Sequence, residues 1–358
     1  MTFLWKEVYE THNVFLDWPG DVPEPQAHYM SRLPKTNVWY KTVPVVHGSR
    51  FSYRLAPNDR GDYPHHTAQT DPLNPRLFTD GDRSNAYGSI LELPGAPDES
   101  WYRRTPSVRG ELSKRTFESE HLKGTRDVSV YTPPGQTASN GPYPLLILLD
   151  GPLYTGTGHA PNTLDNLIAE HRIRPTVVCF VSNGPSRNAD LGNGPDSRDL
   201  TARQTYAAAI ATELVPWLRS SYAVSHNPKD VVIGGHSAGA GTAAFTALSY
   251  AAVFGNVLSQ SVGAGRLVQM AMDAAPKLPV RFYLDVGLYE GGDEACANAE
   301  ALEIFYGRRA TMCCIEKPQA RTRASIFGRP LPTDSSHSSD HLPSDDDVIC
   351  RDQFELIG

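Results

Sequence analysis

Gly235, Ser237 and Gly239 have the spacing of the G-x-S-x-G motif, in which a serine acts as a nucleophile. An apolar run precedes the motif and an alanine-rich segment follows it. The serine is therefore predicted to lie on a strained turn from a strand into a helix, where its neighbours two positions away must be small. A glycine-rich loop with a solvated serine is the alternative. The flanking strand and helix favour the nucleophile.

The same turn is predicted to supply donors for the negatively charged oxygen that forms during acyl transfer. The N–H of Ala238 lies at the predicted helix start, where backbone donors are free and the helix dipole is positive. A second donor is expected from the loop after an earlier apolar strand. Gly151 or Leu153 fits, because Pro152 has no N–H. His236 is expected to pack or hydrogen-bond, since adjacent side chains on such a turn point apart.

A serine reacts at neutral pH only with the help of a base, and this motif places the acid and then the histidine after the serine. The acid is expected in the loop that follows the predicted strand 280–287. Glu290 is the preferred candidate, with Asp293 and Asp285 as alternatives. Asp285 falls within the strand, where its side chain is expected to pack or pair.

The histidine is harder to place than the acid. Of the 12 histidines in the chain, only His337 and His341 follow Glu290. Both lie in a segment rich in Ser and Asp, and no predicted strand precedes either of them. His341 is the candidate base, and a solvated histidine in a tail is the alternative.

Composition excludes several classes of protein. The 358 residues are 40% hydrophobic and 20% charged, with a formal net charge of −7, which argues against a nucleic-acid partner. No apolar run reaches the roughly 18 residues of a membrane span, and the first residues do not form a secretory signal. Five cysteines without a C-x-x-C pair fit a reducing compartment, so the protein is expected to be cytoplasmic. No His, Asp or Glu cluster has metal-ligand spacing, and no cofactor is expected.

The chain is predicted to fold as two domains followed by a tail. Residues 1–108 carry short aromatic and β-branched runs separated by Pro, Gly, Asn and Asp, which is typical of a small Ig-like β-sandwich. Residues 109–310 alternate apolar strands with helices, which predicts a doubly wound, α/β-hydrolase-like sheet. Residues 311–358 show no strand or helix pattern and are predicted to be a divergent, disordered tail.

Eleven stretches between about residue 3 and about residue 307 carry a further signal: FLW, RLPKTNVWYKT, SYRLAPND, QTDPLNP, LLDGPLY, LDNLIAEHRI, SRNADL, ELVPWLRSSY, VVIGGHSAGAG, FGNVLSQS and YLDVGLYE. In these stretches the chain resembles the enterochelin esterases, which hydrolyse the trilactone backbone of catecholate siderophores. Tyr154 replaces the usual Trp of that family, and Ala240 an often-found Gly. The family's C-terminal strand followed by Gly-Gly-His and an acidic residue is not found.

The resemblance implies Ser237 as nucleophile and Glu290 near the acid position. It also implies that Arg187 and Tyr154 contact the substrate, since the planar fork of an arginine suits the clustered oxygens of a ferric catecholate. A loop arginine in a surface salt bridge is the alternative for Arg187. The N-terminal domain would form one wall of the substrate cleft, and the iron would be cargo.

Three functional interpretations follow. The first is a serine esterase that cleaves the trilactone of a ferric siderophore, a small-molecule substrate, to release iron. The second keeps the fold and changes the substrate to another ester, such as a feruloyl or acyl-thiol ester. The third is a non-catalytic homologue that binds a ferric siderophore because its histidine is lost. The sequence leaves the oligomeric state open.

Overall fold

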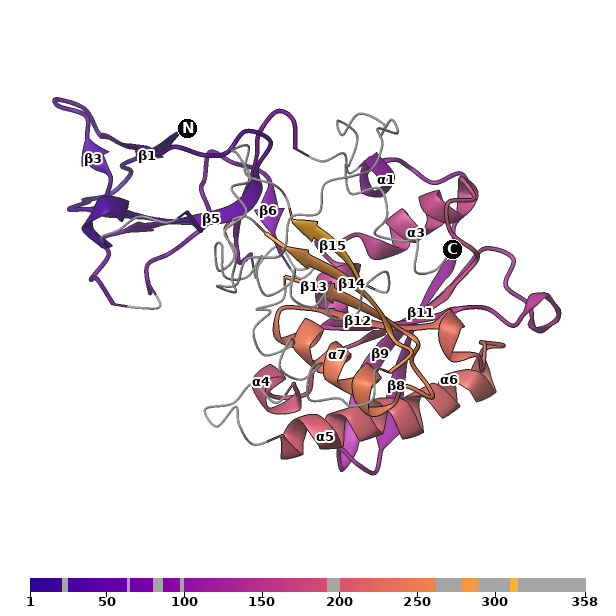
Figure 1. The fold of residues 1–358 in the computed structure, drawn as a ribbon. Helices are drawn as coiled ribbons and strands as arrows, with labels where there is room; N and C mark the ends of the chain where they lie inside the picture. Colours follow the sequence, from indigo (N-terminus) through magenta and orange to yellow (C-terminus); the bar gives the residue numbers. More distant parts are fainter. Residues whose placement is uncertain are drawn as a thin grey trace, which may run out of the picture.

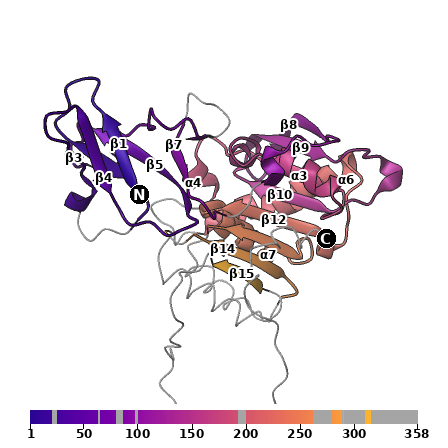
Figure 2. The ribbon, with the colours of Figure 1, turned by 90° about the horizontal axis from the view of Figure 1, so that it is seen from above.

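The structure is a computed structural model that describes residues 1–20, 25–62, 65–79, 86–96, 100–191, 200–261, 278–287, 289 and 310–314. An all-β N-terminal domain lies beside a larger α/β domain (Figures 1 and 2). The predicted fold class is confirmed: all-β sheets precede a mixed sheet of the α/β-hydrolase type.

The N-terminal domain is built from two antiparallel sheets. Its strands are β1 (Thr2–Lys6), β2 (Val14–Asp17), β3 (Ser31–Arg32), β4 (Val38–Thr42), β5 (Arg50–Pro57), β6 (Leu77–Phe78) and β7 (Gly88–Glu92), with a 3-10 helix η1 (Pro25–His28). One sheet has the order β1-β4-β3 and the other β2-β5-β7-β6. In β1 the side chains alternate, so that Phe3 and Trp5 are buried. Phe3 meets Tyr53 of the other sheet with ring centroids 4.8 Å apart, which places one core between the two sheets.

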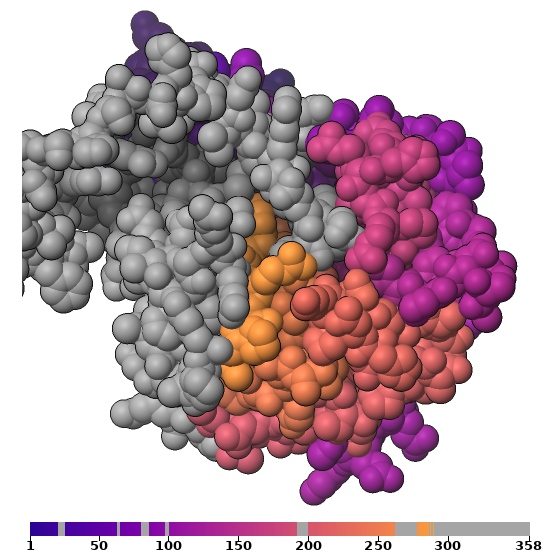
Figure 3. Space-filling model, turned by 45° about the vertical axis from the view of Figure 1, so that its right-hand side comes forward, coloured from indigo at the N-terminus to yellow at the C-terminus, as the bar shows by residue number. Residues whose placement is uncertain are grey.

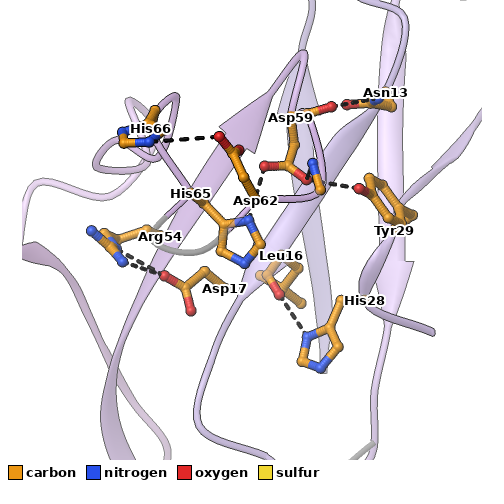
Figure 4. Close-up of polar contacts among 11 residues, drawn as sticks. Asn13, Leu16, Asp17, His28, Tyr29, Arg54, Asp59, Asp62, His65 and His66 are labelled. Carbon is orange, nitrogen blue, oxygen red and sulfur yellow. Dashed lines mark hydrogen bonds and ion pairs between the residues drawn. The ribbon is translucent and has the colours of Figure 1, made fainter. Parts of the chain in front are cut away.

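In this domain, Asp59 contacts Tyr29, Gly61 and His65 through its carboxylate (Figure 4). Its carboxylate accepts hydrogen bonds from the Tyr29 hydroxyl at 2.7 Å and the Gly61 N–H at 2.9 Å, and it lies 2.9 Å from His65 Nδ1. The bond to Asp59, together with burial, raises the pKa of Tyr29 to about 12. The His65 ring stacks on Phe15 with centroids 4.0 Å apart. These contacts order the start of the turn-rich stretch at 65–85.

A single eight-stranded sheet forms the centre of the second domain, within the described residues. Its strands are β8 (Glu111–Ser119), β9 (Gly124–Thr132), β10 (Leu145–Leu149), β11 (Val177–Val181), β12 (Val231–His236), β13 (Asn256–Gln260), β14 (Arg281–Val286) and β15 (Ala310–Cys314). The order is β15-β14-β13-β12-β10-β11-β9-β8. The pairs from β15 to β11 are parallel, whereas β9 and β8 are added antiparallel. The runs LSKRTFESEHL and RDVSVYTPP predict this antiparallel pair.

The prediction that no strand follows residue 310 is wrong for Ala310–Cys314. This segment pairs in parallel with β14, from Phe282↔Ala310 to Val286↔Cys314. The sequence of this segment, ATMCC, does not alternate strictly between apolar and polar residues, so the strand depends on the ladder that β14 offers. The rest of the predicted tail lies outside the described residues.

Helices cover both faces of the sheet (Figure 1). They are α1 (Ser100–Arg103), α2 (Gly151–Thr155), α3 (Ala160–Ala169), α4 (Arg187–Asp190), α5 (Thr201–Ala208), the π-helix η4 (Ala209–Leu214), α6 (Val215–Ser221) and α7 (Ala238–Ser249), with 3-10 helices η3 (Ala138–Asn140) and η5 (Pro228–Asp230). Alternate residues of β10 enter two different cores. Leu145, Ile147 and Leu149 pack with α5, α6 and α7, whereas Leu146 and Leu148 pack with α3. Continuous apolar strands are thus explained by burial on both faces.

The segment TLDNLIAEHRI predicts a helix capped by Thr163, but the observed helix α3 begins earlier. It starts at Ala160, with Pro161 in its first turn, and Thr163 lies inside it with its hydroxyl bonded to the His159 carbonyl at 3.3 Å. The segment GRLVQMAMDAA also predicts a helix over 265–275, and this segment lies outside the described residues. In the space-filling view (Figure 3), segments 100–191, in purple to pink, and 200–261, in red to orange, form one continuous surface. None of the described helices is both long and apolar enough to cross a membrane.

Candidate active site

Ser237 lies on a sharp turn between β12 and α7, as the sequence predicts. Its φ of 55° and ψ of −117° fall in a region that residues with a side chain rarely adopt, and the residue is exposed. The Ser237 N–H donates to the carbonyl of Gln260 at 2.8 Å, which ties the turn to the end of β13. A strained, exposed serine at a helix N-terminus is the geometry of a nucleophile elbow.

The two glycines of the motif make this turn possible. A side chain on Gly235 would place its Cβ 2.6 Å from the carbonyl carbon of Gly239. A Cβ on Gly239 would lie 2.6 Å from the Asp150 Oδ2 atom. Both distances are shorter than real Cβ contacts, so the expectation that these positions must be small is confirmed. The first turn of α7 can therefore lie directly against β12 and the end of β10.

The two predicted oxyanion donors are the first residues of two neighbouring helices. Ala238 begins α7 and Gly151 begins α2, and their N–H groups have no acceptor within their own helices. The parent strands β12 and β10 pair in parallel with Leu148 opposite Gly234, so the two helix starts lie at the same edge. Leu153, the alternative donor, already donates to the Asp150 carbonyl at 3.0 Å. Gly151 therefore stays the proposed second donor.

Beneath the turn, the buried carboxylate of Asp150 pairs with Arg187. Arg187 Nε and Nη2 donate to the two carboxylate oxygens at 2.6 and 2.8 Å, and Asn183 Nδ2 adds a bond of 2.7 Å. Arg187 Nη2 also donates to the carbonyl of His236 at 3.3 Å, one residue before the serine. The bond to Asp150 raises the pKa of Arg187 further above its ordinary value. Arg187 thus supports the turn, through a salt bridge that the sequence left open as its alternative role.

Sequence reasoning missed Asp150, although its signal is visible. The apolar run of β10 ends in Asp-Gly, and Asp150 takes a left-handed φ of 61° at the start of α2. A carboxylate at the end of a buried strand needs a partner, and Arg187 is 37 residues away in the chain. No local pattern indicates that pairing. The predicted contact of Arg187 with substrate stays a prediction, since 39% of its side chain is exposed.

Tyr154 belongs to a second polar network at the same edge of the sheet. Its hydroxyl donates to Gln260 Oε1 at 2.8 Å, and Gln260 Nε2 donates to Asp285 Oδ2 at 3.3 Å. Asp285 Oδ1 also accepts the Ser261 N–H at 2.8 Å, so Asp285 pairs, as expected of a residue inside the strand. Burial, and then the nearby Asp285 and Asp150 carboxylates, raise the pKa of Tyr154. Gln260 bonds Tyr154 and Asp285 through its side chain and the Ser237 N–H through its carbonyl, and it was not predicted.

The predicted acid Glu290 and base His341 lie outside the described residues, as do the alternatives Asp293 and His337. In the part of the chain that the structure describes, no histidine hydrogen-bonds to the Ser237 hydroxyl. There, too, no group of three His, Cys, Asp or Glu side chains is arranged to hold a metal ion.

Tyr289, which directly precedes Glu290, is anchored in the N-terminal domain. The N–H of Val46 donates to its hydroxyl at 3.0 Å. Its ring packs on those of Phe51 and Trp18, with centroids 5.5 and 6.0 Å away. Tyr289 is therefore held by the core of the other domain, one position before the predicted acid in the sequence.

Comparisons with known proteins match both domains. A family model described as "Putative esterase" matches residues 119–313, and one described as "Enterochelin esterase, N-terminal" matches residues 1–102. The iron(III) enterobactin esterase of Dickeya dadantii is 26% identical over 303 residues, covering 73% of this chain and 65% of the relative. That of Escherichia coli K12 is 27% identical over 253 residues, covering 66% and 60%. The chain thus spans less than two thirds of the length of these relatives.

Solved structures show the same fold. The ferric enterobactin esterase of Salmonella typhimurium has a TM-score of 0.69 at 23% identity and covers 87% of each chain. The enterobactin esterase of Shigella flexneri, solved in the presence of enterobactin, has a TM-score of 0.69 at 23% identity, covering 87% of this chain and 85% of that one. The "Putative esterase" model matches more than half of the chain, and the enterochelin esterase model matches its N-terminal domain. The chain therefore belongs to the enterochelin esterase family.

Proposed function

We propose that the protein is a serine esterase that hydrolyses the trilactone ester bonds of a ferric catecholate siderophore and so releases its iron. The observation that carries this proposal is the strained, exposed Ser237 at the start of α7, in a chain of the enterochelin esterase family. Relatives named as iron(III) enterobactin esterases support the choice of substrate.

In the proposed reaction, Ser237 Oγ attacks the carbonyl carbon of one ester bond. His341 takes the hydroxyl proton, and Glu290 orients the imidazole. The N–H groups of Ala238 and Gly151 hold the negative oxygen of the tetrahedral intermediate. The intermediate then expels the alcohol of the neighbouring unit, which receives the proton, and the serine stays acylated. Water, deprotonated by the same base, releases the acid and restores the serine.

The N-terminal domain is proposed to form one wall of the substrate cleft. Two contacts support this role. The N–H of Thr79 donates to Thr157 Oγ1 at 2.7 Å, just after α2, and Tyr289 is anchored in the N-terminal core after β14. Both α2 and β14 border the edge of the sheet where Ser237 lies. A rigid ferric tris-catecholate is large and needs more than one protein surface to hold it.

A substrate panel tests the proposal. The purified protein is mixed with ferric trilactone, iron-free trilactone or a p-nitrophenyl ester, and the products are followed by chromatography. Ser237→Ala is compared with Ser220→Ala, an exposed serine on α6. We expect trilactone cleavage by wild type and Ser220→Ala, and a fall of at least about 10³-fold in Ser237→Ala.

The other outcomes select the other interpretations. Turnover of the p-nitrophenyl ester alone, lost in Ser237→Ala, would indicate an esterase for a different ester. Saturable binding of the ferric siderophore without any turnover would indicate a non-catalytic homologue. Either result would contradict the proposed function.

A further inference from the structure

Gln260, the last residue of β13, holds the serine turn through its backbone. It lies opposite His236 in the parallel pairing of β12 with β13, and its carbonyl accepts the Ser237 N–H at 2.8 Å. Because Ser237 precedes α7, its N–H has no acceptor within that helix. The direction of the Gln260 carbonyl therefore fixes one end of the strained turn.

The same peptide unit is held from its other side by Asp285 on β14. Its N–H, which belongs to Ser261, donates to Asp285 Oδ1 at 2.8 Å. A peptide unit is planar and rigid, so the carboxylate and the Ser237 N–H are coupled through a single plane. Ser261 takes a left-handed φ of 51°, which a residue with a side chain keeps only where its surroundings enforce it. Asp285 supplies such a restraint.

The Gln260 side chain ties the same carboxylate to α2. Its Nε2 donates to Asp285 Oδ2 at 3.3 Å, and its Oε1 accepts from the Tyr154 hydroxyl at 2.8 Å. An ionised carboxylate can only accept hydrogen bonds, so the amide must turn its NH2 towards Asp285 and its oxygen towards Tyr154. Each donor thus meets an acceptor along the path from α2 to β14.

This network reaches both of the helix starts that are proposed to hold the oxyanion. Tyr154 lies on α2, which begins at Gly151, and the peptide unit after Gln260 holds the residue that precedes Ala238. The three side chains of the network are partly buried, where water competes weakly for their hydrogen bonds. A change in the network would therefore move the serine and the two donors relative to each other.

We propose that Asp285, Gln260 and Tyr154 form a positioning unit, which fixes Ser237 relative to the two oxyanion donors. This role rests on the proposed function, in which Ser237 is the nucleophile. The unit acts through the peptide between residues 260 and 261 and through α2, not through contact with the reacting ester bond. Displacement of a reacting group by about 1 Å can cost about 100-fold in rate, so loss of the unit should lower kcat and leave KM nearly unchanged.

A reciprocal exchange of the amide and the carboxylate tests the unit. Gln260→Glu brings two carboxylates together at the 3.3 Å contact, where they repel each other. Adding Asp285→Asn reverses the donor and the acceptor: the new amide can accept the Ser261 N–H and donate to the new carboxylate, which still accepts from Tyr154. We expect kcat on the ferric trilactone to fall about 10- to 100-fold in Gln260→Glu and to recover to within about threefold of wild type in the double variant.

Further measurements separate positioning from folding and from substrate binding. Gln204→Glu makes the same change of charge at an exposed position on α5 and should react as wild type does. Urea denaturation shows which variants are folded, and KM should stay within about twofold of wild type in each of them. Tyr154→Phe removes a single oxygen atom, and we expect a several-fold fall in kcat from it, even if Gln260→Glu is unfolded.

Labelling by a fluorophosphonate reports on Ser237 without the siderophore. In this reaction Ser237 Oγ bonds to phosphorus, the P–F bond breaks, fluoride leaves and the hydroxyl proton passes to the base or to water. We expect the labelling rate to fall in Gln260→Glu and to recover in the double variant, in parallel with kcat.

The positioning unit and the proposed function fail in different ways. A wild-type kcat and labelling rate in folded Gln260→Glu would overturn the unit, even if the trilactone is cleaved. A raised KM with an unchanged labelling rate would also overturn it, because the residues would then act on the substrate. Labelling that depends on Gln260, without any cleavage of the trilactone, would support the unit and overturn the proposed function.

Discussion

At Ser237 the backbone adopts φ 55° and ψ −117°. For a residue with a side chain, this conformation costs about 1–3 kcal/mol of free energy. The conformation persists because the packing and the hydrogen bonds around the turn hold it in place. Gly235 and Gly239 let β12 and α7 approach each other, and the Ser237 N–H is bonded to Gln260. Strain and exposure are thus concentrated on the residue that is proposed to react.

The glycines of the motif should differ in their tolerance of a methyl group. Gly235→Ala places a Cβ 2.6 Å from the Gly239 carbonyl carbon, so we expect it to lower the free energy of unfolding by about 1–3 kcal/mol or more. Gly241→Ala is the control, because its Cβ would meet nothing within 4 Å and alanine favours a helix. It should leave the free energy unchanged or raise it by up to about 1 kcal/mol. Urea denaturation measures both, and equal effects would contradict the packing argument.

A substitution of Arg187 can distinguish whether this residue supports the serine turn or binds the substrate. Arg187→Met would leave the Asp150 carboxylate buried without its cation, so we expect a loss of unfolding free energy on the order of 3 kcal/mol. Adding Asp150→Asn should restore part of the loss. If the arginine instead acts mainly on the substrate, Arg187→Met would raise KM for the trilactone and leave the unfolding free energy as in wild type. Urea denaturation and steady-state kinetics on the same samples decide between the two roles.

At the scale of elements, helix starts and strand ends converge on one edge of the sheet. The local sequence predicted most of these elements, because apolar runs such as that of β10 and the glycines of the serine turn have local physical causes. Asp150, Gln260 and Tyr289 escaped prediction because their partners lie far away in the chain. The ladder that defines β15 is likewise tertiary.

Tyr289 joins two elements that belong to different domains. Tyr289→Phe keeps the ring and leaves the Val46 N–H without its acceptor, so we expect a loss of about 1–2 kcal/mol in unfolding free energy. Tyr289→Ala also removes the packing on Phe51 and Trp18. If Glu290 is the acid, kcat on the trilactone should fall in Tyr289→Ala much more than KM changes. A wild-type kcat in a folded Tyr289→Ala protein would contradict this coupling.

At the scale of the whole molecule, charged and polar side chains connect the N-terminal sheet to the α/β domain. Glu92 ends β7 and pairs with Arg76, which directly precedes β6, and with Arg103, which lies on α1. Through Asn162 and Asn166, α3 binds the backbone carbonyl groups around α1. The arginine cluster around Glu92 thus lies where the N-terminal sheet meets the segment that packs on the α/β domain.

Glu92 should make the stability of the molecule depend on acid pH. Its pKa falls from an ordinary 4.5 to about 2 in the folded protein, so its contribution is fully present above about pH 4.5 and is lost as the pH falls towards 2. Glu92→Gln should lack this contribution. We therefore expect the difference in urea midpoint between wild type and Glu92→Gln to shrink from pH 5 to pH 3. A difference that stays constant over this range would contradict the assigned pKa.

The central claim is that Ser237 becomes acylated by the trilactone. The protein is mixed with excess ferric trilactone, quenched in acid within the first turnover, and examined by intact-mass and peptide mass spectrometry. We expect an acyl adduct on the peptide that contains Ser237, and no adduct and no hydrolysis in Ser237→Ala. Trilactone hydrolysis at the wild-type rate in Ser237→Ala would contradict the account.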